Sequence, residues 1–159
     1  IDNVIPFISG EQDKIEIEPR KIFGRVADGR VEFAPIDIAV QVYRVPVLDG
    51  HLISVHLETE LSLTPDDAAA LLAAFRGEPQ ERRLPSAPPE PVVVVGERDR
   101  PQPRLDRMAG AGMAAVVGQV RACPVLGLHL SVLGHNTIRG AAGGTLLIAE
   151  MLADRGLLP

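Results

Sequence analysis

Arg44 and His51 are the two residues of this chain whose types and positions best suit chemistry on a small anion. Residues 36–44 alternate between apolar and polar like a β-strand, and Arg44 continues their apolar face. Residues 51–57 repeat this alternation with His51 on the apolar face, and Asp-Gly in the intervening segment 45–50 favours a turn. If the two strands form a hairpin, a guanidinium and an imidazole meet at one end of a largely buried surface. A buried guanidinium without a partner suits an anion, and a nearby imidazole can move protons near neutral pH.

The size and composition of the chain limit the classes of protein to which it can belong. Its 159 residues, 46% hydrophobic and 23% charged, are enough for one folded domain with a core. A formal charge of −5 and an aromatic content of 3% argue against nucleic-acid binding, which needs a basic face or stacking platforms. The sequence contains no apolar run of about 18 residues that would span a membrane. Its single cysteine, Cys123, excludes an internal disulfide and fits a cytoplasmic protein.

Helix signals come before and after the two strands. Ser9 and Gln12 fit a capping box at the start of a first helix, and Pro19 predicts that a second turn starts there instead of one long helix. Thr64 followed by Pro65 predicts the N-terminus of another helix, which runs to Arg76-Gly77. These helices alternate with runs of strands and not in strict βαβ order, which predicts an α+β domain with a mixed, largely antiparallel sheet.

The second half of the chain contains the remaining predicted elements. Residues 78–91 are rich in proline and favour an extended surface connection. The predicted strands are 92–95, buried on both faces, then 113–120 and 126–133, and a last helix covers 137–155. Glycines at 140, 143 and 144 each weaken that helix by about 1 kcal/mol, which indicates that something approaches the backbone there.

Several polar residues also have an ordinary structural interpretation. On spacing alone, Lys14 with Glu11 and Glu18 is typical of a solvated salt-bridge ladder, and Asn136 is typical of a helix cap. We expect Cys123 to be structural, because it lies before a proline between two strands. We expect His56 and His129 at the surface, since they alternate outward from their strands, and His135 to be structural.

Motifs along essentially the whole chain resemble a known family. They are residues 3–11, 14–16 and 18–22, then 44–47 and 49–51, and finally 84–88, 99–107 and 135–144. Together they resemble the C-terminal substrate-binding and dimerisation domain of aspartate-semialdehyde dehydrogenase, and the last three resemble its archaeal and fungal branch. The resemblance implies a sheet with helices packed on one face and a homodimer or homotetramer. It also implies an N-terminal nucleotide-binding domain, against which the helix 137–155 would pack. The chain begins at Ile1 without a methionine, so we expect it to be part of a longer protein.

The resemblance also implies a reaction and a set of site residues. The family reduces aspartyl phosphate to aspartate semialdehyde with NADPH, through a thioester on a catalytic cysteine, in the biosynthesis of lysine, threonine and methionine. By match, His51 would be the acid/base catalyst and Arg44 would hold the substrate carboxylate, which suits a bidentate guanidinium. Glu11 would contact the substrate amino group and Lys14 the phosphate. Asn136 and Gly140 would lie at the NADP cofactor, and the match implies no metal ligand.

Two departures from the family pattern leave other functions open. Leu52 and Ile53 follow His51 where the family usually has a small hydroxyl residue and then glutamate, and Tyr43 replaces a smaller polar residue. A reductase of a CoA thioester, such as malonyl-CoA reductase, or a catalytically silent dimerisation homologue is compatible with these changes. The sequence leaves the choice between NADP and NAD open. No matched nucleophile is present, so we expect this chain alone to lack reductase activity.

Overall fold

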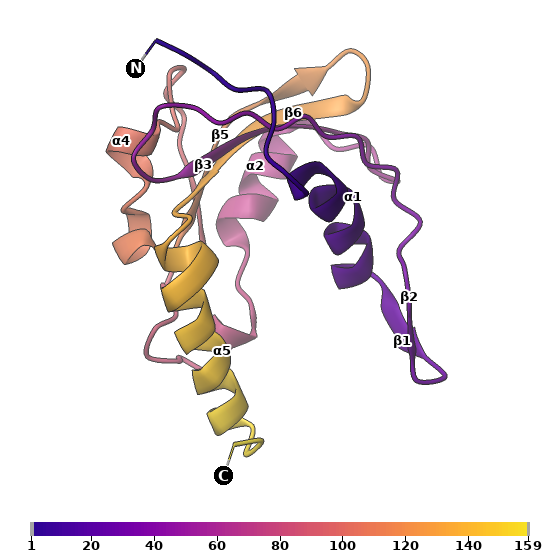
Figure 1. The fold of residues 1–159 in the computed structure, drawn as a ribbon, viewed down its shortest axis with the longest axis vertical. Coiled ribbons are helices and arrows are strands. Elements are labelled where there is room, and N and C mark those ends of the chain that lie inside the picture. The colour runs from indigo at the N-terminus through magenta and orange to yellow at the C-terminus, as the bar shows by residue number, and fades with distance from the viewer. Residues whose placement is uncertain (1, 159) are drawn as a thin grey trace. The chain divides into compact units, whose positions relative to one another are not determined.

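The computed structural model describes residues 2–158, which form two compact units, one up to residue 47 and one from residue 48 on. The first unit contains the helix α1 (Glu11–Ile22) and a ribbon of two antiparallel strands, β1 (Arg25–Ala27) and β2 (Arg30–Glu32), all visible in Figure 1. The expectation of a single domain over the whole chain stays a prediction.

The start and the middle of α1 differ from the sequence-based prediction. Gly10, in a left-handed conformation with φ of 73°, is the N-cap residue, and no side chain caps the helix, so the predicted capping box at Ser9 is wrong. The Gln12 amide donates instead to the Val40 carbonyl at 3.2 Å. Pro19 lies inside the helix and does not start a new one. The helix continues past Pro19, whose carbonyl still accepts a hydrogen bond from Phe23 N at 2.9 Å, although the proline itself has no N–H to donate.

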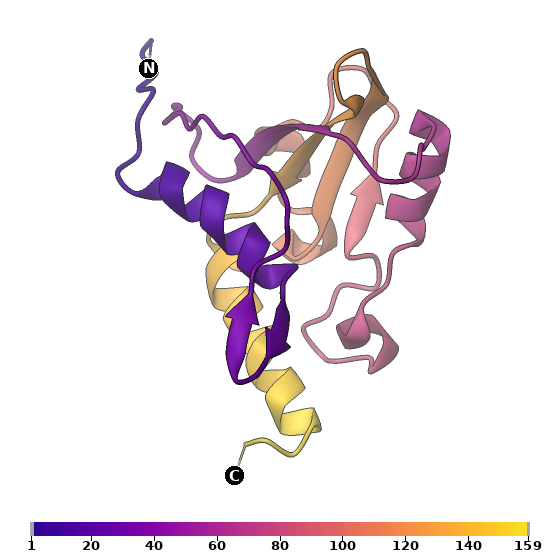
Figure 2. The same ribbon diagram turned by 90° about the vertical axis from the view of Figure 1, so that its right-hand side faces the viewer.

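The second unit is built on a four-stranded sheet with the strand order β3-β6-β5-β4 (Figures 1 and 2). Its elements are β3 (His51–Leu57), α2 (Pro65–Ala74), α3 (Glu78–Glu81), β4 (Val92–Val94), α4 (Pro103–Asp106), a 3-10 turn (Ala109–Gly112), β5 (Ala115–Cys123), β6 (Gly127–Gly134), a π-helical turn (Ile138–Ala142) and α5 (Gly143–Asp154). β3 and β5 run antiparallel to β6, while β4 runs parallel to β5. This mixed, largely antiparallel sheet confirms the predicted α+β class.

The predicted hairpin between residues 36–44 and 51–57 is wrong. β3 pairs along its whole length with β6, from His51 opposite Gly134 to Leu57 opposite Leu128. Residues 36–43 belong to no strand, although their alternation survives as a buried Val42 between an exposed Gln41 and an exposed Tyr43. A period of two specifies which side chains share a face, but it does not specify which strand becomes the partner.

Three further expectations about burial and secondary structure are wrong. β4 pairs only with β5 and is an edge strand, and its valines are half-buried, so it is not a strand buried on both faces. Residues 78–91 contain the short helix α3 and are not simply extended, and Leu84 within them is 7% exposed. His129 is 8% exposed and not a surface residue, since β6 lies between two neighbouring strands. His56 is exposed, as expected.

The core of the second unit lies where β5 and β6 pair. Its most deeply buried residues are Ala114, Val116, Val117, Leu128 and Leu133. The helix α2 packs against β4 and β5, and Thr64 caps it by accepting a hydrogen bond from Asp67 N at 3.1 Å, as predicted. Among residues 2–158, no helix is both long and apolar enough to cross a membrane.

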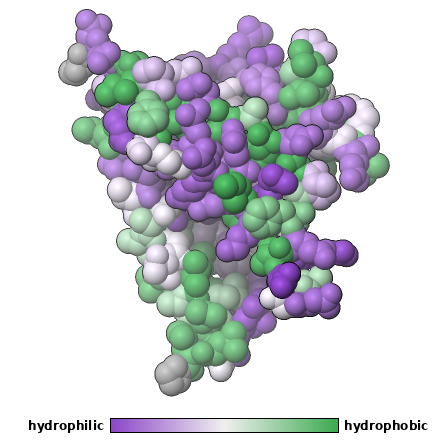
Figure 3. All heavy atoms as spheres, turned by 45° about the vertical axis from the view of Figure 1, so that its right-hand side comes forward, coloured by the Kyte–Doolittle hydropathy of each residue, from purple (hydrophilic) through white to green (hydrophobic). Residues whose placement is uncertain are grey.

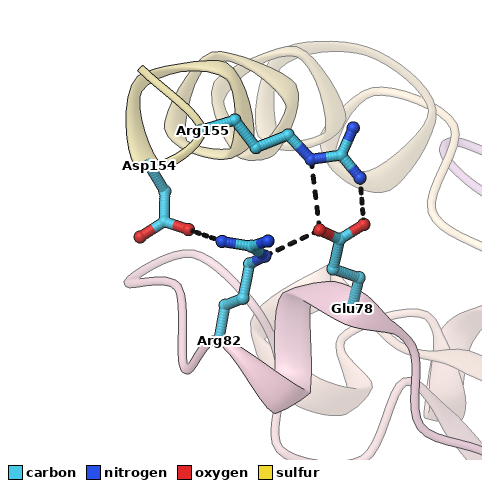
Figure 4. A network of polar contacts seen from close by, with 4 residues as sticks. All are labelled: Glu78, Arg82, Asp154 and Arg155. Atoms are coloured by element: carbon cyan, nitrogen blue, oxygen red, sulfur yellow. Dashed lines mark hydrogen bonds and ion pairs between the residues drawn. The ribbon is translucent and has the colours of Figure 1, made fainter. Parts of the chain in front are cut away.

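A network of charged side chains ties the C-terminal end of α5 to α3 (Figure 4). Glu78 accepts from Arg82 Nε at 2.7 Å and from Arg155 Nε at 3.1 Å, while Arg82 also pairs with Asp154. The hydrogen bonds from Arg155 and Arg82 hold the pKa of Glu78 below its usual range. One helical turn earlier on α5, Glu150 accepts from Ser86 Oγ at 2.6 Å and from Ser86 N at 2.9 Å. These contacts hold the C-terminal half of α5 to α3 and to Ser86.

Candidate functional site

In the second unit, the structure brings His51 and Asn136 together at one end of the sheet. His51 begins β3 opposite Gly134, the last residue of β6, and Asn136 follows two residues later. The Asn136 Oδ1 accepts a hydrogen bond from Gly50 N at 2.8 Å, so the residue just before His51 is joined to Asn136. The His51 side chain is exposed. This end of the sheet therefore carries His51 and Asn136 on two turns that a hydrogen bond joins.

The hydrogen bond from Gly50 determines how the Asn136 amide is oriented. A backbone N–H can only donate, so the atom that faces it must be the amide oxygen, and Nδ2 is left as a donor. Asn136 is therefore not the helix cap that its spacing suggests. The N-cap residue is Thr137, and the side chain of His135, 5% exposed, supports the turn: its Nδ1 accepts from Ile138 N at 3.4 Å and lies 3.2 Å from Thr137 Oγ1.

Gly140 lies in the π-helical turn that connects Asn136 to α5. Its N–H donates to His135 O at 3.0 Å, and its backbone is exposed. π-helical turns inside helices are frequent at functional sites, because the wider turn exposes backbone groups. The predicted close approach to the glycines occurs within this unit at Gly143, where a side chain would collide with Met113.

The motif 99–107 supports the Asp49-Gly50 turn, a role that its sequence does not predict. Asp106, 6% exposed, accepts from Arg100 Nε at 2.7 Å and from Gln102 N at 2.6 Å, and the Arg100 contact lowers the pKa of Asp106. The next residue, Arg107, brings its Nη1 within 3.5 Å of Asp49 O. These residues all lie in the motif 99–107, but nothing in their spacing shows that Arg107 reaches Asp49, 58 residues away.

In the first unit, Arg44 is held by its backbone. Its N–H donates to Ile5 O at 2.8 Å, and its carbonyl accepts from Ile5 N at 3.1 Å, which forms an isolated antiparallel bridge. The guanidinium is exposed, so it does not lie on the buried surface that the alternation predicts. It makes no ion pair with any described residue of its own unit. The backbone of Arg44 is therefore fixed, while its guanidinium has no ion-pair partner among the described residues of this unit.

Glu11 and Lys14 lie on the first turn of α1, in the same unit as Arg44. Residues three or four positions apart on a helix lie on the same face, so Glu11 and Lys14 can contact one ligand. Within the described part of this unit they form no ion pair with each other or with Glu18, so the salt-bridge ladder that their spacing suggests is absent there. The bond from Gln12 holds this turn to Val40, and the bridge at Arg44 holds Ile5, which precedes α1.

Cys123 cannot act together with His51. It ends β5 opposite Gly127, at the far end of β6 from Gly134 and His51. Seven residue steps along a strand at about 3.3 Å each separate the two ends by roughly 20 Å. The backbone N–H groups of Leu126 and Val125, with Arg121 nearby, lower the pKa of the thiol. At this distance the thiol of Cys123 cannot take part in chemistry at His51, which fits the expectation that Cys123 is structural.

A pair of histidines in the sheet gives a prediction for acid stability. His129 Nδ1 lies 2.9 Å from His56 Nε2, and burial, followed by the charges of Arg121 and His56, lowers the pKa of His129. A lowered pKa means that the unfolded chain binds the proton more readily, so stability is complete above the ordinary histidine pKa of about 6.5 and falls below it.

We therefore expect the thermal midpoint of the protein to fall as pH is lowered from 7 toward 5. The replacement His129→Gln should flatten this dependence, and His56→Gln should flatten it less, because His56 is the smallest of the three causes. Thermal unfolding followed by circular dichroism at several pH values measures both. An equally steep pH dependence in His129→Gln contradicts the assignment.

The candidate residues thus form two groups. His51, Asn136 and Gly140 come together in the second unit, whereas Arg44, Glu11 and Lys14 belong to the first. That the two groups share one pocket stays a prediction.

Comparisons with known proteins identify similar sequences and structures. The family model for the semialdehyde dehydrogenase dimerisation domain matches residues 1–139. The chain is 46% identical over 157 residues to an aspartate-semialdehyde dehydrogenase of Archaeoglobus fulgidus, and this match covers 99% of the chain and 45% of the relative. It is 40% identical over 163 residues to that of Schizosaccharomyces pombe, which covers 99% of this chain and 46% of the relative.

A solved structure extends these matches to three dimensions. The crystal structure of aspartate semialdehyde dehydrogenase with NADP from Candida albicans has a TM-score of 0.92 to this chain at 36% identity. The match covers 99% of this chain and 46% of that one. The chain therefore spans a little under half the length of the relatives that it matches.

Proposed function

Since this chain belongs to the semialdehyde dehydrogenase family, whose dimerisation-domain model matches residues 1–139, we propose that it is the C-terminal half of an aspartate-semialdehyde dehydrogenase. The proposed reaction is the NADPH-dependent reduction of aspartyl phosphate to aspartate semialdehyde, through a thioester on a cysteine outside this chain. Family membership is the observation that carries the proposal. The archaeal and fungal relatives confirm the resemblance of the motifs to that branch. The cellular role would be cytoplasmic synthesis of lysine, threonine and methionine.

The first unit would bind the substrate. Arg44 would hold the substrate carboxylate through two parallel hydrogen bonds, which its planar guanidinium can form and a lysine cannot. Glu11 would accept from the substrate ammonium group, and Lys14 would attract the phosphate. These opposite charges, one helical turn apart, match a zwitterionic phosphorylated substrate. None of these three side chains forms an ion pair with a described residue of this unit, which leaves their charged groups available to a ligand.

The second unit would supply the proton transfers and one side of the cofactor site. His51 would give a proton to the hemithioacetal oxygen during reduction and take one back when the thiolate leaves. The free Nδ2 of Asn136 fits a nicotinamide carboxamide, whose carbonyl oxygen accepts hydrogen bonds, and the exposed Gly140 backbone leaves room for a ring. When bound, the dinucleotide supplies the hydride. The choice of NADP is part of this proposal.

The proposed partners would cover apolar surface that the chain exposes. Figure 3 shows apolar atoms around the C-terminal end of the chain, where Leu146, Ile148 and Leu157 are 54%, 63% and 65% exposed. A helix with such a surface needs a partner. We assign α5 to the N-terminal nucleotide-binding domain that the family resemblance implies, and the assembly to a homodimer or homotetramer.

We predict that the full-length protein oxidises aspartate semialdehyde with NADP and phosphate, and that residues 1–159 alone do not. The reason is that Cys123, the only cysteine of the chain, lies roughly 20 Å from His51. NADPH formation followed by absorbance measures both proteins, and Cys123→Ser in the full-length protein should retain wild-type turnover. The prediction is wrong if residues 1–159 alone turn over the substrate and the substitution Cys123→Ser abolishes that activity.

A reductase of a CoA thioester and a silent dimerisation homologue remain the alternatives, since Leu52 and Ile53 follow His51. Both side chains are about half exposed, at 53% and 52%, and they are the two residues of β3 that follow His51. Assaying the full-length protein with aspartate semialdehyde and with malonyl-CoA distinguishes the three. Turnover of malonyl-CoA alone supports the first alternative, and turnover of neither supports the second.

A further inference from the structure

The hydrogen bond between Gly50 and Asn136 lies outside the sheet and connects two turns that are distant in sequence. The β3–β6 ladder begins with His51 opposite Gly134, so the Gly50 N–H is not part of it. Its acceptor is the Asn136 side chain, 86 residues away, at 2.8 Å. Both residues are half-buried, which makes an unpaired N–H at this point costly.

The other hydrogen bonds to the turn before His51 are both longer: Arg107 Nη1 donates to Asp49 O and Thr137 Oγ1 to Asp49 Oδ1, each at 3.5 Å. Gly50 has φ of 110°, a conformation that residues with a side chain rarely adopt. A Cβ at Gly50 would lie 3.2 Å from Leu133 Cδ1 and 3.4 Å from Pro103 Cβ, so the turn fits closely against the core. β3 is an edge strand, and its first residue has neighbours on one side only. The bond to Asn136 is therefore the shortest one that holds this turn, and without it the start of β3, which carries the imidazole, is held less firmly.

Asn136 is itself held in place from both sides. Gly134, two residues earlier, pairs in the sheet, and the buried His135 accepts from Ile138 N and fixes the turn that follows. The side chain therefore projects from a rigid position. Its oxygen is committed to Gly50, and its nitrogen is left for a ligand.

We propose that Asn136 is a positioning residue for His51: its Oδ1 anchors the turn from which His51 projects, while its Nδ2 is the group that donates to the cofactor. The second half of this statement rests on the proposed function, and the first half does not. One side chain thus links the position of the proton-transfer group to the cofactor site.

The test compares Asn136→Ala with Asn136→Asp in the full-length protein. Alanine removes both functions, whereas aspartate keeps an oxygen for Gly50 N and loses the donor. Amide hydrogen exchange of the peptide that contains Gly50, measured by mass spectrometry, should speed up about tenfold in Asn136→Ala and stay near wild type in Asn136→Asp. Thr145→Val is the control, because Thr145 lies on α5 and bonds only to Ala141 O among the described residues.

Steady-state kinetics supply the second readout. Both variants should raise the KM for NADP about tenfold, but only Asn136→Ala should also lower kcat, because only there does His51 lose its anchored turn. Exchange at Gly50 that is unchanged in Asn136→Ala, or equally fast in both variants, overturns the positioning role. A wild-type protein without turnover contradicts the proposed function instead, and the exchange experiment still decides the role of Oδ1.

Discussion

Replacement of His51 by alanine is expected to lower kcat for aspartate semialdehyde by about 100- to 10,000-fold, the usual contribution of a positioned general acid/base. Folding should be unaffected, since the side chain is exposed at the start of an edge strand and β3 pairs through its backbone. The KM values should change little, because the imidazole acts on the reacting oxygen and not on the bound carboxylate. Phosphate-dependent NADPH formation by the full-length protein measures the loss.

His56→Ala provides a matched control on the same strand. His56 is also an exposed histidine of β3, but it lies five residues further along, paired with His129 and away from Asn136. Its replacement should leave kcat within twofold of wild type, although it can alter acid stability. If His51→Ala retains more than a tenth of the activity, or if His56→Ala loses as much, His51 is not the acid/base group.

The second large effect is expected from Arg44→Lys, which keeps the charge and removes the planar fork. The value of kcat/KM for aspartate semialdehyde should fall about 10- to 100-fold, as expected for loss of a hydrogen bond between charged groups. The KM for NADP should not change, because Arg44 would contact the substrate carboxylate only. The bridge to Ile5 uses the Arg44 backbone, so the local fold should survive the substitution.

Arg30→Lys tests whether any exposed arginine of the first unit would behave in the same way. Arg30 is an exposed residue of β2, and its replacement should leave both kinetic constants at wild-type values. A lysine at position 44 that works as well as arginine would contradict a bidentate carboxylate site. If neither Arg44→Lys nor His51→Ala affects an active protein, the site lies elsewhere.

Much of the candidate site was predictable because it rests on residue types. A guanidinium, an imidazole and a pair of opposite charges one helical turn apart are visible in the sequence, and their order along the chain resembles one family. What could not be predicted is which atoms they use. Asn136 has the spacing of a helix cap, yet its oxygen bonds to Gly50 and the neighbouring His135 supports the helix instead. Short polar side chains have several partners within reach, and only the folded chain selects one.

By itself, the sequence determined the family, the α+β class, the position of β3 and the capped start of α2, because these depend on alternation and on neighbours within a few residues. Only the tertiary structure decided that β3 pairs with β6 and not with residues 36–44, that His129 is buried, and that Met113 lies against Gly143. The physical reason is that these three depend on strands and turns far apart in the chain. Alternation marks a face for burial, but which partner covers it is settled by the packing of the whole unit.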